Sequence, residues 1–291
     1  MQLGHHTITW GGVVGDATGV TSVKDLYYRT TGSIEQAFRD IAAAGFTGTE
    51  MFDGNLVDLG PERVRELLAE TGLSLVSVYT GANFIYDEIL PDELHRVQRA
   101  CQLARAAGAQ RLVVGGGARR ASGTTDRDFE QLARALDQVV DLAEDAGLSA
   151  TYHPHLTTIV ESPTELERLL PQTRIGFCPD TAHLAAGGGD PAALIRRYPE
   201  RVQHVHLKDL RLDPFTFLPL GQGEIDFRDV LRAVQETGYD SWLIVELDSY
   251  DGDPAEAARI SKSYLDGLLA ELGLSIHTPA AAGRLSPGAS S

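Results

Sequence analysis

Cysteine is scarce in this chain of 291 residues, which contains only Cys101 and Cys178. Two thiols give no disulfide framework, so we expect a reduced, cytoplasmic protein. No run of about 18 or more uninterrupted apolar residues occurs, so we expect no membrane-spanning helix and no membrane partner. The first residues, MQLGHHTITWGG, lack a basic segment followed by an apolar run, so no secretory signal is expected.

Basic residues are also few, with 25 Lys and Arg against 41 Asp and Glu and a formal net charge of −16. Proteins that bind nucleic acid gain most of their affinity from cations that neutralise phosphates. No run of Lys or Arg compensates for the acidic balance, so we expect no nucleic-acid partner. A hydrophobic content of 43% with 23% charged residues is that of a globular domain with enough apolar material for a large core.

The chain repeats one pattern, an apolar strand followed by an amphipathic helix. The expected strands lie at 5–10, 48–52, 73–81, 111–117, 148–155, from 174 onward, 201–210 and 241–248. The expected helices lie at 33–45, 61–72, 93–108, 128–147, 162–170, 190–198, 226–238 and 253–273. Eight such pairs predict a parallel sheet with right-handed crossovers, closed into a (β/α)₈ TIM barrel.

An open, doubly wound sheet is the rival fold. It usually has a glycine-rich fingerprint after the first strand, and WGGVVGDATG does not have the G-x-G-x-x-G spacing. We therefore expect one barrel domain at residues 1–275. Residues 276–291 are small, polar and rich in Pro and Gly, so we expect a disordered C-terminal tail there.

Polar side chains gather where the strands end, which is where TIM barrels carry reactive residues. His153, Asp180, His206 and Glu246 end four different strands on faces that the period of two directs inward. Unpaired, these groups would be costly to bury together, so we expect one divalent metal ion among them. Carboxylates mixed with imidazoles favour Mn²⁺, with Co²⁺, Mg²⁺ or Zn²⁺ as alternatives.

Each residue also has a purely structural explanation. A lone histidine at a strand end is more often hydrogen-bonded scaffolding than a ligand. Glu50 could pair with a helix end, and Asp180 could cap a following helix whose first turn contains His183. Lys208 and Asp209 could form a solvated pair. A serine hydrolase is not supported, because no G-x-S-x-G motif occurs.

Five segments occur in a familiar order: GFTGTEMF, YHPHLTTIVES, FCPDTAHLA, HVHLKD and VELD. Together they resemble the xylose isomerase-like TIM barrel superfamily, which contains sugar isomerases, ketose 3-epimerases, inosose dehydratases and an endonuclease branch. The resemblance spans residues 3 to about 274 and is most similar to the inosose dehydratase-like branch. It implies Asp180, His206 and Glu246 as metal ligands, with His153 where the superfamily usually has glutamate.

The resemblance implies removal of a proton next to the carbonyl of a keto-sugar or keto-cyclitol, through an enediolate. Reprotonation would give isomerisation or epimerisation, and loss of a β-hydroxyl would give dehydration. His153 in place of glutamate removes one of the two carboxylates thought to shuttle protons in the epimerases. The expected catalytic residues are His155, Lys208, Glu50 and His183, and the expected substrate contacts are Trp10, Tyr79, His204 and Glu161.

Two other functions remain open from the sequence. A non-catalytic sugar-binding barrel would be expected to have lost more ligands, and an endonuclease would need more histidines and a basic groove. An unphosphorylated polyol substrate is favoured because no arginine cluster marks the mouth, although Arg119 and Arg120 could serve. A homo-oligomer, dimer or tetramer, would follow the superfamily's habit.

Two glycine-rich segments are expected near the substrate. Gly115–Gly117 lacks the lysine and serine of a phosphate-binding loop, and such glycines often make room for substrate. The segment 11–32, which contains Tyr27, Tyr28 and Arg29, is expected to form part of a lid.

Overall fold

The computed structural model describes residues 1–14 and 22–276, so the expected disordered tail lies almost entirely outside the described residues. Its main sheet has eight parallel strands in the order β8-β7-β6-β5-β4-β1-β12-β9. Parallel bridges from Phe177 to Val202 and from Asp180 to His206 join the β8 segment to the β9 segment and close the barrel. The strands are β1 (Gln2–His6), β4 (Gly48–Phe52), β5 (Ser74–Ala82), β6 (Arg111–Gly116), β7 (Ser149–Tyr152), β8 (Gly176–Phe177), β9 (Val205–Leu207) and β12 (Trp242–Val245).

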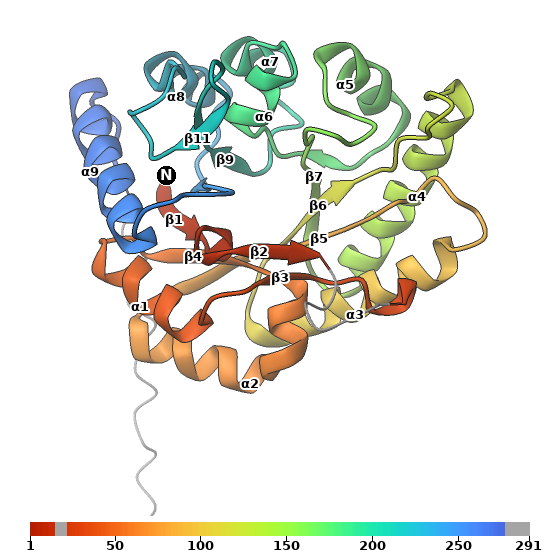
Figure 1. The fold of residues 1–291 in the computed structure, drawn as a ribbon, viewed down its shortest axis with the longest axis horizontal. Coiled ribbons are helices and arrows are strands. Elements are labelled where there is room, and N and C mark those ends of the chain that lie inside the picture. Colours follow the sequence, from red (N-terminus) through yellow and green to blue (C-terminus); the bar gives the residue numbers. More distant parts are fainter. Residues whose placement is uncertain (15–21, 277–291) are drawn as a thin grey trace, which may run out of the picture.

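Helices surround the strands, as Figure 1 shows, which confirms the expected (β/α)₈ architecture. The α2 helix is interrupted at Gly60, whose φ of 77° is not helical, so the predicted helix from Pro61 is its second half. The helices are α1 (Ile34–Ala43), α2 (Asp53–Thr71), α3 (Leu90–Ala107), α4 (Asp126–Asp145), α5 (Pro163–Leu169), α6 (Thr181–Ala186), α7 (Pro191–Arg197), α8 (Phe227–Glu236) and α9 (Pro254–Leu272). The 3₁₀ turns are η1 (Thr7–Trp10), η2 (Val23–Asp25) and η3 (Leu170–Gln172).

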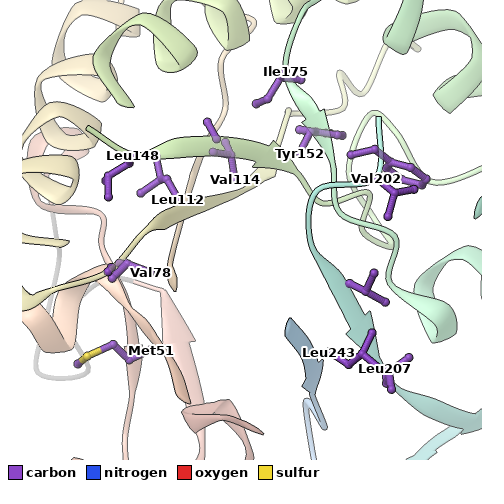
Figure 2. Close-up of a cluster of buried hydrophobic side chains, with 14 of the residues drawn as sticks. Met51, Val78, Leu112, Val114, Leu148, Tyr152, Ile175, Val202, Leu207 and Leu243 are labelled. Carbon is purple, nitrogen blue, oxygen red and sulfur yellow. The ribbon is translucent and has the colours of Figure 1, made fainter. Parts of the chain in front are cut away.

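Each strand presents alternate residues to two different cores. The outer faces carry apolar side chains that pack under the helices, among them Met51, Val78 and Leu207 (Figure 2). Their neighbours in sequence, Glu50 and His206, lie on the opposite face of the same strands, inside the barrel. This alternation is the physical reason that polar residues can converge inside an otherwise apolar fold.

The lower part of the barrel interior is filled by large apolar side chains from β12. Trp242 and Ile244 pack with Val76 of β5. A Cβ atom on Gly48 would collide with the Trp242 ring, and one on Gly4 would lie 2.7 Å from Ile244 Cδ1. The two glycines therefore leave the space that these side chains occupy, and the polar residues lie above this layer.

Two small hairpins, which the sequence did not predict, extend the loops at the barrel mouth. One consists of β2 (Gly12–Val14) and β3 (Tyr28–Thr30), and the other of β10 (Asp209–Arg211) and β11 (Thr216–Leu218). The first hairpin belongs to the expected lid segment, of which residues 15–21 lie outside the described part. Asp53 and Asn55 at the start of α2 accept the backbone N–H groups of Tyr28 and Thr30, which attaches this hairpin to the barrel.

The first strand is shorter than expected, because it ends at His6 rather than at Trp10. His6 accepts the N–H of Ile8 through Nδ1 and caps the η1 turn, so the chain leaves the sheet there. Among the described residues, no helix is both long and apolar enough to cross a membrane.

Candidate metal centre and active site

Four side chains from different strand ends meet at the C-terminal mouth of the barrel: His153, Asp180, His206 and Glu246. One ligand atom from each lies within 4.8 Å of the others, and all four residues are buried. His153 Nε2 is 3.4 Å from Asp180 Oδ2 and 3.6 Å from Glu246 Oε2, and His206 Nδ1 is 2.5 Å from Glu246 Oε2. The structure thus brings together the four residues predicted as ligands.

Asp180 serves the fold and the cluster with different oxygen atoms. Its Oδ1 accepts the N–H of His183 at 2.8 Å and caps α6, as the structural alternative proposed. Its Oδ2 faces the cluster and has no hydrogen-bond partner there. The bridge between Asp180 and His206 at the closing seam of the barrel places these two side chains next to each other.

Two features make the cluster suitable for a divalent cation: it has buried polar atoms without hydrogen-bond partners, and it contains negatively charged carboxylates. Both ring nitrogens of His153 and Asp180 Oδ2 are buried without hydrogen-bond partners, which is costly for polar atoms. Burial lowers the pKa of His206, but Cys178, Glu50 and Glu246 beside it raise that pKa well above its usual value. The imidazole therefore takes up a proton where a cation would otherwise balance the carboxylates.

Lys208 lies against the same carboxylates and is fully buried. Its Nζ is 3.3 Å from Asp180 Oδ2, 3.4 Å from Glu246 Oε2 and 2.7 Å from Asp248 Oδ1. Burial lowers the pKa of Lys208, but these carboxylates outweigh it and raise the pKa above its usual value. Lys208 is therefore an ammonium donor at the cluster, and the suggested solvated pair with Asp209 is wrong because both side chains are buried.

A second group of side chains forms the rim next to Lys208. His183 Nε2 lies 2.9 Å from Lys208 Nζ and 3.3 Å from Asp248 Oδ2. The ring of His155 lies 3.7 Å from that of His183, centroid to centroid, and its side chain is 35% exposed. The two predicted catalytic histidines thus lie together at the open side of the cluster.

His155 is arranged as an acceptor. Its Nδ1 lies 2.7 Å from the carbonyl oxygen of Leu156, which can only accept, so Nδ1 carries the proton. Burial, reinforced by His183, lowers the pKa of His155 to about 3, so the ring is neutral at pH 7. Nε2 then has a free lone pair and can accept a hydrogen bond, whereas the sequence suggested an acid or donor.

Glu50 and His204 lie one layer below the cluster, inside the barrel. His204 Nε2 is 2.9 Å from Glu50 Oε2, and both side chains are fully buried. Burial lowers the pKa of His204 to about 4. These positions favour support of the cluster over the substrate contact expected for His204 and the catalytic contact expected for Glu50.

The remaining predicted contacts divide into one neighbour of the cluster and two distant residues. Tyr79 packs edge-on against His153, with ring centroids 5.6 Å apart. Trp10 donates its indole N–H to Asp40 of α1 and packs against the outer core, because the chain leaves the sheet after His6. Glu161 accepts the N–H of Thr157 and pairs with Arg119 at 3.3 Å, so its carboxylate is engaged away from the cluster.

A cavity of about 260 Å³ lies at the C-terminal ends of β5 and β6. It is also lined by the β2–β3 hairpin, by α3 and by the loop after β7, and its lining includes Tyr28, Asn83, Arg96 and Thr158. Gly116 and Gly117 of the expected glycine run line this cavity. A Cβ on Gly115 would collide with the Tyr79 hydroxyl, on Gly116 with a backbone oxygen and on Gly117 with Ile159, so none of the three positions has room for a side chain unless these neighbours move.

Four residues of the site were missed as functional by the sequence reasoning: His6, Ser77, Asp248 and Phe217. Asp248 shares its strand face with Glu246, and that period of two could have found it. Phe217 lies on the unexpected β11 strand, with its ring 5.4 Å from Lys208 Nζ and 5.7 Å from the His183 ring. Hairpins this short leave little periodicity, so no sequence signal pointed to Phe217.

The fold is a closed (β/α)₈ barrel with buried carboxylates and imidazoles clustered at its C-terminal mouth, close enough to hold a metal ion. Residues 38–268 match the family model described as xylose isomerase-like TIM barrel. The chain belongs to this family.

Two relatives at 30% identity agree with that assignment, and a solved structure shares the fold. An inosose dehydratase of Lacticaseibacillus casei is 30% identical over 271 residues, which cover 81% of this chain and 90% of the relative. An inosose dehydratase of Geobacillus kaustophilus (strain HTA426) is 30% identical over 276 residues, covering 82% and 88%. The structure of an L-ribulose 3-epimerase superposes with a TM-score of 0.73 at 18% identity, covering 96% of this chain and 99% of that one, and so shows the shared fold.

Proposed function

We propose that this protein is a divalent-metal-dependent dehydratase that acts on an inosose, a keto-cyclitol. The observation that carries the proposal is the buried cluster of His153, Asp180, His206 and Glu246 beside the ammonium group of Lys208. The inosose dehydratases at 30% identity supply the substrate class. Mn²⁺ is the proposed ion, and a homo-oligomer in a reducing cytoplasm remains our prediction.

The four cluster residues would hold the ion, and a divalent cation there would polarise the substrate carbonyl and acidify the neighbouring C–H. His155 Nε2, a free acceptor, takes that proton. Lys208 donates a proton to the β-hydroxyl, which leaves as water while a C=C bond forms between the two carbons. Phe217 covers Lys208 and His183 and keeps water from the donor.

Dehydration is favoured over epimerisation by the asymmetry of this site. An epimerase needs proton-transfer groups on both faces of the reacting carbon, and after β7 this chain has His153 instead of the usual glutamate. The groups next to the cluster are instead a neutral histidine, His155, and a buried lysine, Lys208, which are an acceptor and a donor. This pair suits removal of a proton and departure of a hydroxyl from adjacent carbons.

An uncharged polyol is favoured over a sugar phosphate. Arg119 faces Glu161 and Glu165, and Arg120 binds Asp128 at 2.8 Å, so the two arginines suggested for a phosphate are already paired. The cavity at the ends of β5 and β6 is lined by Arg96, whose charge is opposed by Asp53 at 3.5 Å. Its hydroxyl and amide groups can bind the ring hydroxyls of a cyclitol.

The test is to incubate Mn²⁺-loaded protein with an inosose and follow the unsaturated product by absorbance and by NMR in D₂O. We expect turnover that is lost when metal is removed with a chelator and restored by Mn²⁺. Asp180→Asn should abolish both metal binding and turnover while leaving the α6 cap in place. Epimerised substrate without loss of water, or turnover that survives metal removal, would contradict the proposal.

A further inference from the structure

A buried carboxylate, that of Glu50, lies directly beneath the candidate metal centre. Its Oε2 is 2.9 Å from His204 Nε2, and its Oε1 is 3.2 Å from His206 Nε2 and 3.4 Å from His6 Nε2. Ser77 donates its hydroxyl to Oε2. A buried charge is destabilising unless it is well paired, so we looked for a role of this network in the barrel.

The sheet is built to bring these groups together. His6, Glu50 and Ser77 are paired across the adjacent strands β1, β4 and β5, so their side chains share the inner face. The pairing of Glu50 with Ser77 depends on a bulge, because Thr49 pairs with Leu75 and one extra residue intervenes. Regular pairing would put apolar Val76 opposite the carboxylate. Bulges next to active sites redirect side chains in this way.

His206 connects this network to the cluster through its two ring nitrogens. Nδ1 lies 2.5 Å from Glu246 Oε2, within the cluster, and Nε2 faces Glu50. A histidine that binds a metal generally donates its other N–H to a carboxylate or carbonyl, which fixes the tautomer and the ring orientation. An ionised carboxylate can only accept, so Glu50 selects the tautomer whose free lone pair is on Nδ1.

We propose that Glu50 is a positioning residue that holds His206 with Nδ1 directed at the metal. His204 and the hydroxyl of Ser77 hold Glu50 in turn, and Glu50 does not touch substrate. The proposal rests on the metal requirement of the proposed function but not on the identity of the substrate. In this proposal, the polar residues inside the barrel below the mouth increase the affinity of the site for its metal.

The test compares Glu50→Gln with the wild type by direct binding of Mn²⁺ and Co²⁺. Glutamine keeps the size of the side chain but loses the charge that selects the tautomer. We expect the dissociation constants for both ions to rise about tenfold to a hundredfold, with a changed visible spectrum of bound Co²⁺. The matched control is Thr49→Val at the preceding, equally buried position, whose hydroxyl donates to the backbone carbonyls of His5 and Glu50 and to no side chain of the network.

Ser77→Ala keeps the test decisive if Glu50→Gln does not fold. It removes one hydrogen bond to Glu50 and should raise the dissociation constant for Mn²⁺ by a smaller factor. Wild-type affinity together with an unchanged Co²⁺ spectrum in Glu50→Gln, or in Ser77→Ala where only that variant folds, would overturn the proposal.

Metal stoichiometry separates the remaining outcomes. Two bound ions per wild-type chain would overturn the proposal, because the second could occupy Glu50, His204 and His206, which also lie close enough to hold a metal. One bound ion is expected. A wild type that binds metal but does not dehydrate an inosose would refute the proposed function and leave the role of Glu50 standing.

Discussion

Lys208→Met should separate catalysis from metal binding. The substitution removes a fully buried ammonium group while keeping an unbranched side chain of similar length. Two unit charges about 4 Å apart interact by about 4 kcal/mol at an effective dielectric constant of 20, and Nζ lies 3.3 and 3.4 Å from the oxygen atoms of Asp180 and Glu246 that face the cluster. Lys208 therefore competes with a cation for the same oxygens.

The expected result is metal binding at least as tight as in the wild type, with turnover reduced about a hundredfold or more through loss of the proton donor. Without metal, the variant should be about 3–5 kcal/mol less stable, because removing one partner of a buried ion pair leaves the carboxylates uncompensated. Mn²⁺ should then raise its melting temperature more than it raises that of the wild type.

The assays are thermal unfolding with and without Mn²⁺ and turnover of an inosose. Lys262→Met is the matched control, because Asp266, one turn further along α9, is the one acidic partner of Lys262 within the described residues, and such an i,i+4 pair contributes about 0.3–0.5 kcal/mol. Full turnover in Lys208→Met, or loss of metal binding with unchanged stability of the metal-free protein, would refute this reasoning.

Further predictions concern the histidines, the barrel interior and the hairpin. His155→Ala should bind Mn²⁺ normally and lose about a hundredfold in turnover. His153→Ala should weaken Mn²⁺ binding itself. If both variants bind Mn²⁺ and turn over substrate as the wild type does, the two histidines have only a structural role. Gly48→Ala should cost about 1–3 kcal/mol of unfolding free energy by overpacking the barrel interior, and a wild-type denaturation midpoint would contradict this. Burial raises the pKa of Asp53 from 3.8 to about 6 against the opposing pull of Arg96, so this group's contribution to stability falls as the pH rises from about 4 to 6. Asp53→Asn should lack that part of the pH dependence of the melting temperature, and an unchanged slope would show that other groups cause it.

The sequence predicted the barrel and the convergence of four polar residues at its mouth because both depend on local periodicity. Eight alternations of strand and helix leave few topologies, and the period of two then decides which side chains point inward. The period of two gave the wrong position for Trp10. The segment HHTITW keeps the alternating pattern of a strand up to Trp10, but β1 ends at His6. His6 caps the η1 turn, which sends Trp10 outward to α1, and His6 itself becomes the inward residue of that strand.

Contacts between distant segments were beyond the reach of sequence patterns. The alternatives for Asp180, helix cap or ligand, were posed as exclusive, but a carboxylate has two oxygen atoms and the structure uses each for one purpose. Lys208 and Asp209 looked like a surface pair because their partners lie elsewhere in the chain. Lys208 binds Asp248, 40 residues away, and Asp209 accepts the N–H groups of Gly221 and Gly223.

The buried carboxylates, the lysine and the histidines near the mouth have to be considered together, because their charges depend on one another. Asp180, Glu246 and Asp248 face one buried lysine, and a fourth buried carboxylate, Glu50, lies beneath them with only histidines and Ser77 around it among the described residues. Neutral histidines would leave three negative charges without a partner, and protonated ones would lose the lone pairs needed to bind a metal. A divalent cation offsets two of these charges and lets the imidazoles remain ligands. Without a cation, the excess negative charge inside the barrel is destabilising. We therefore expect the barrel to bind a divalent cation.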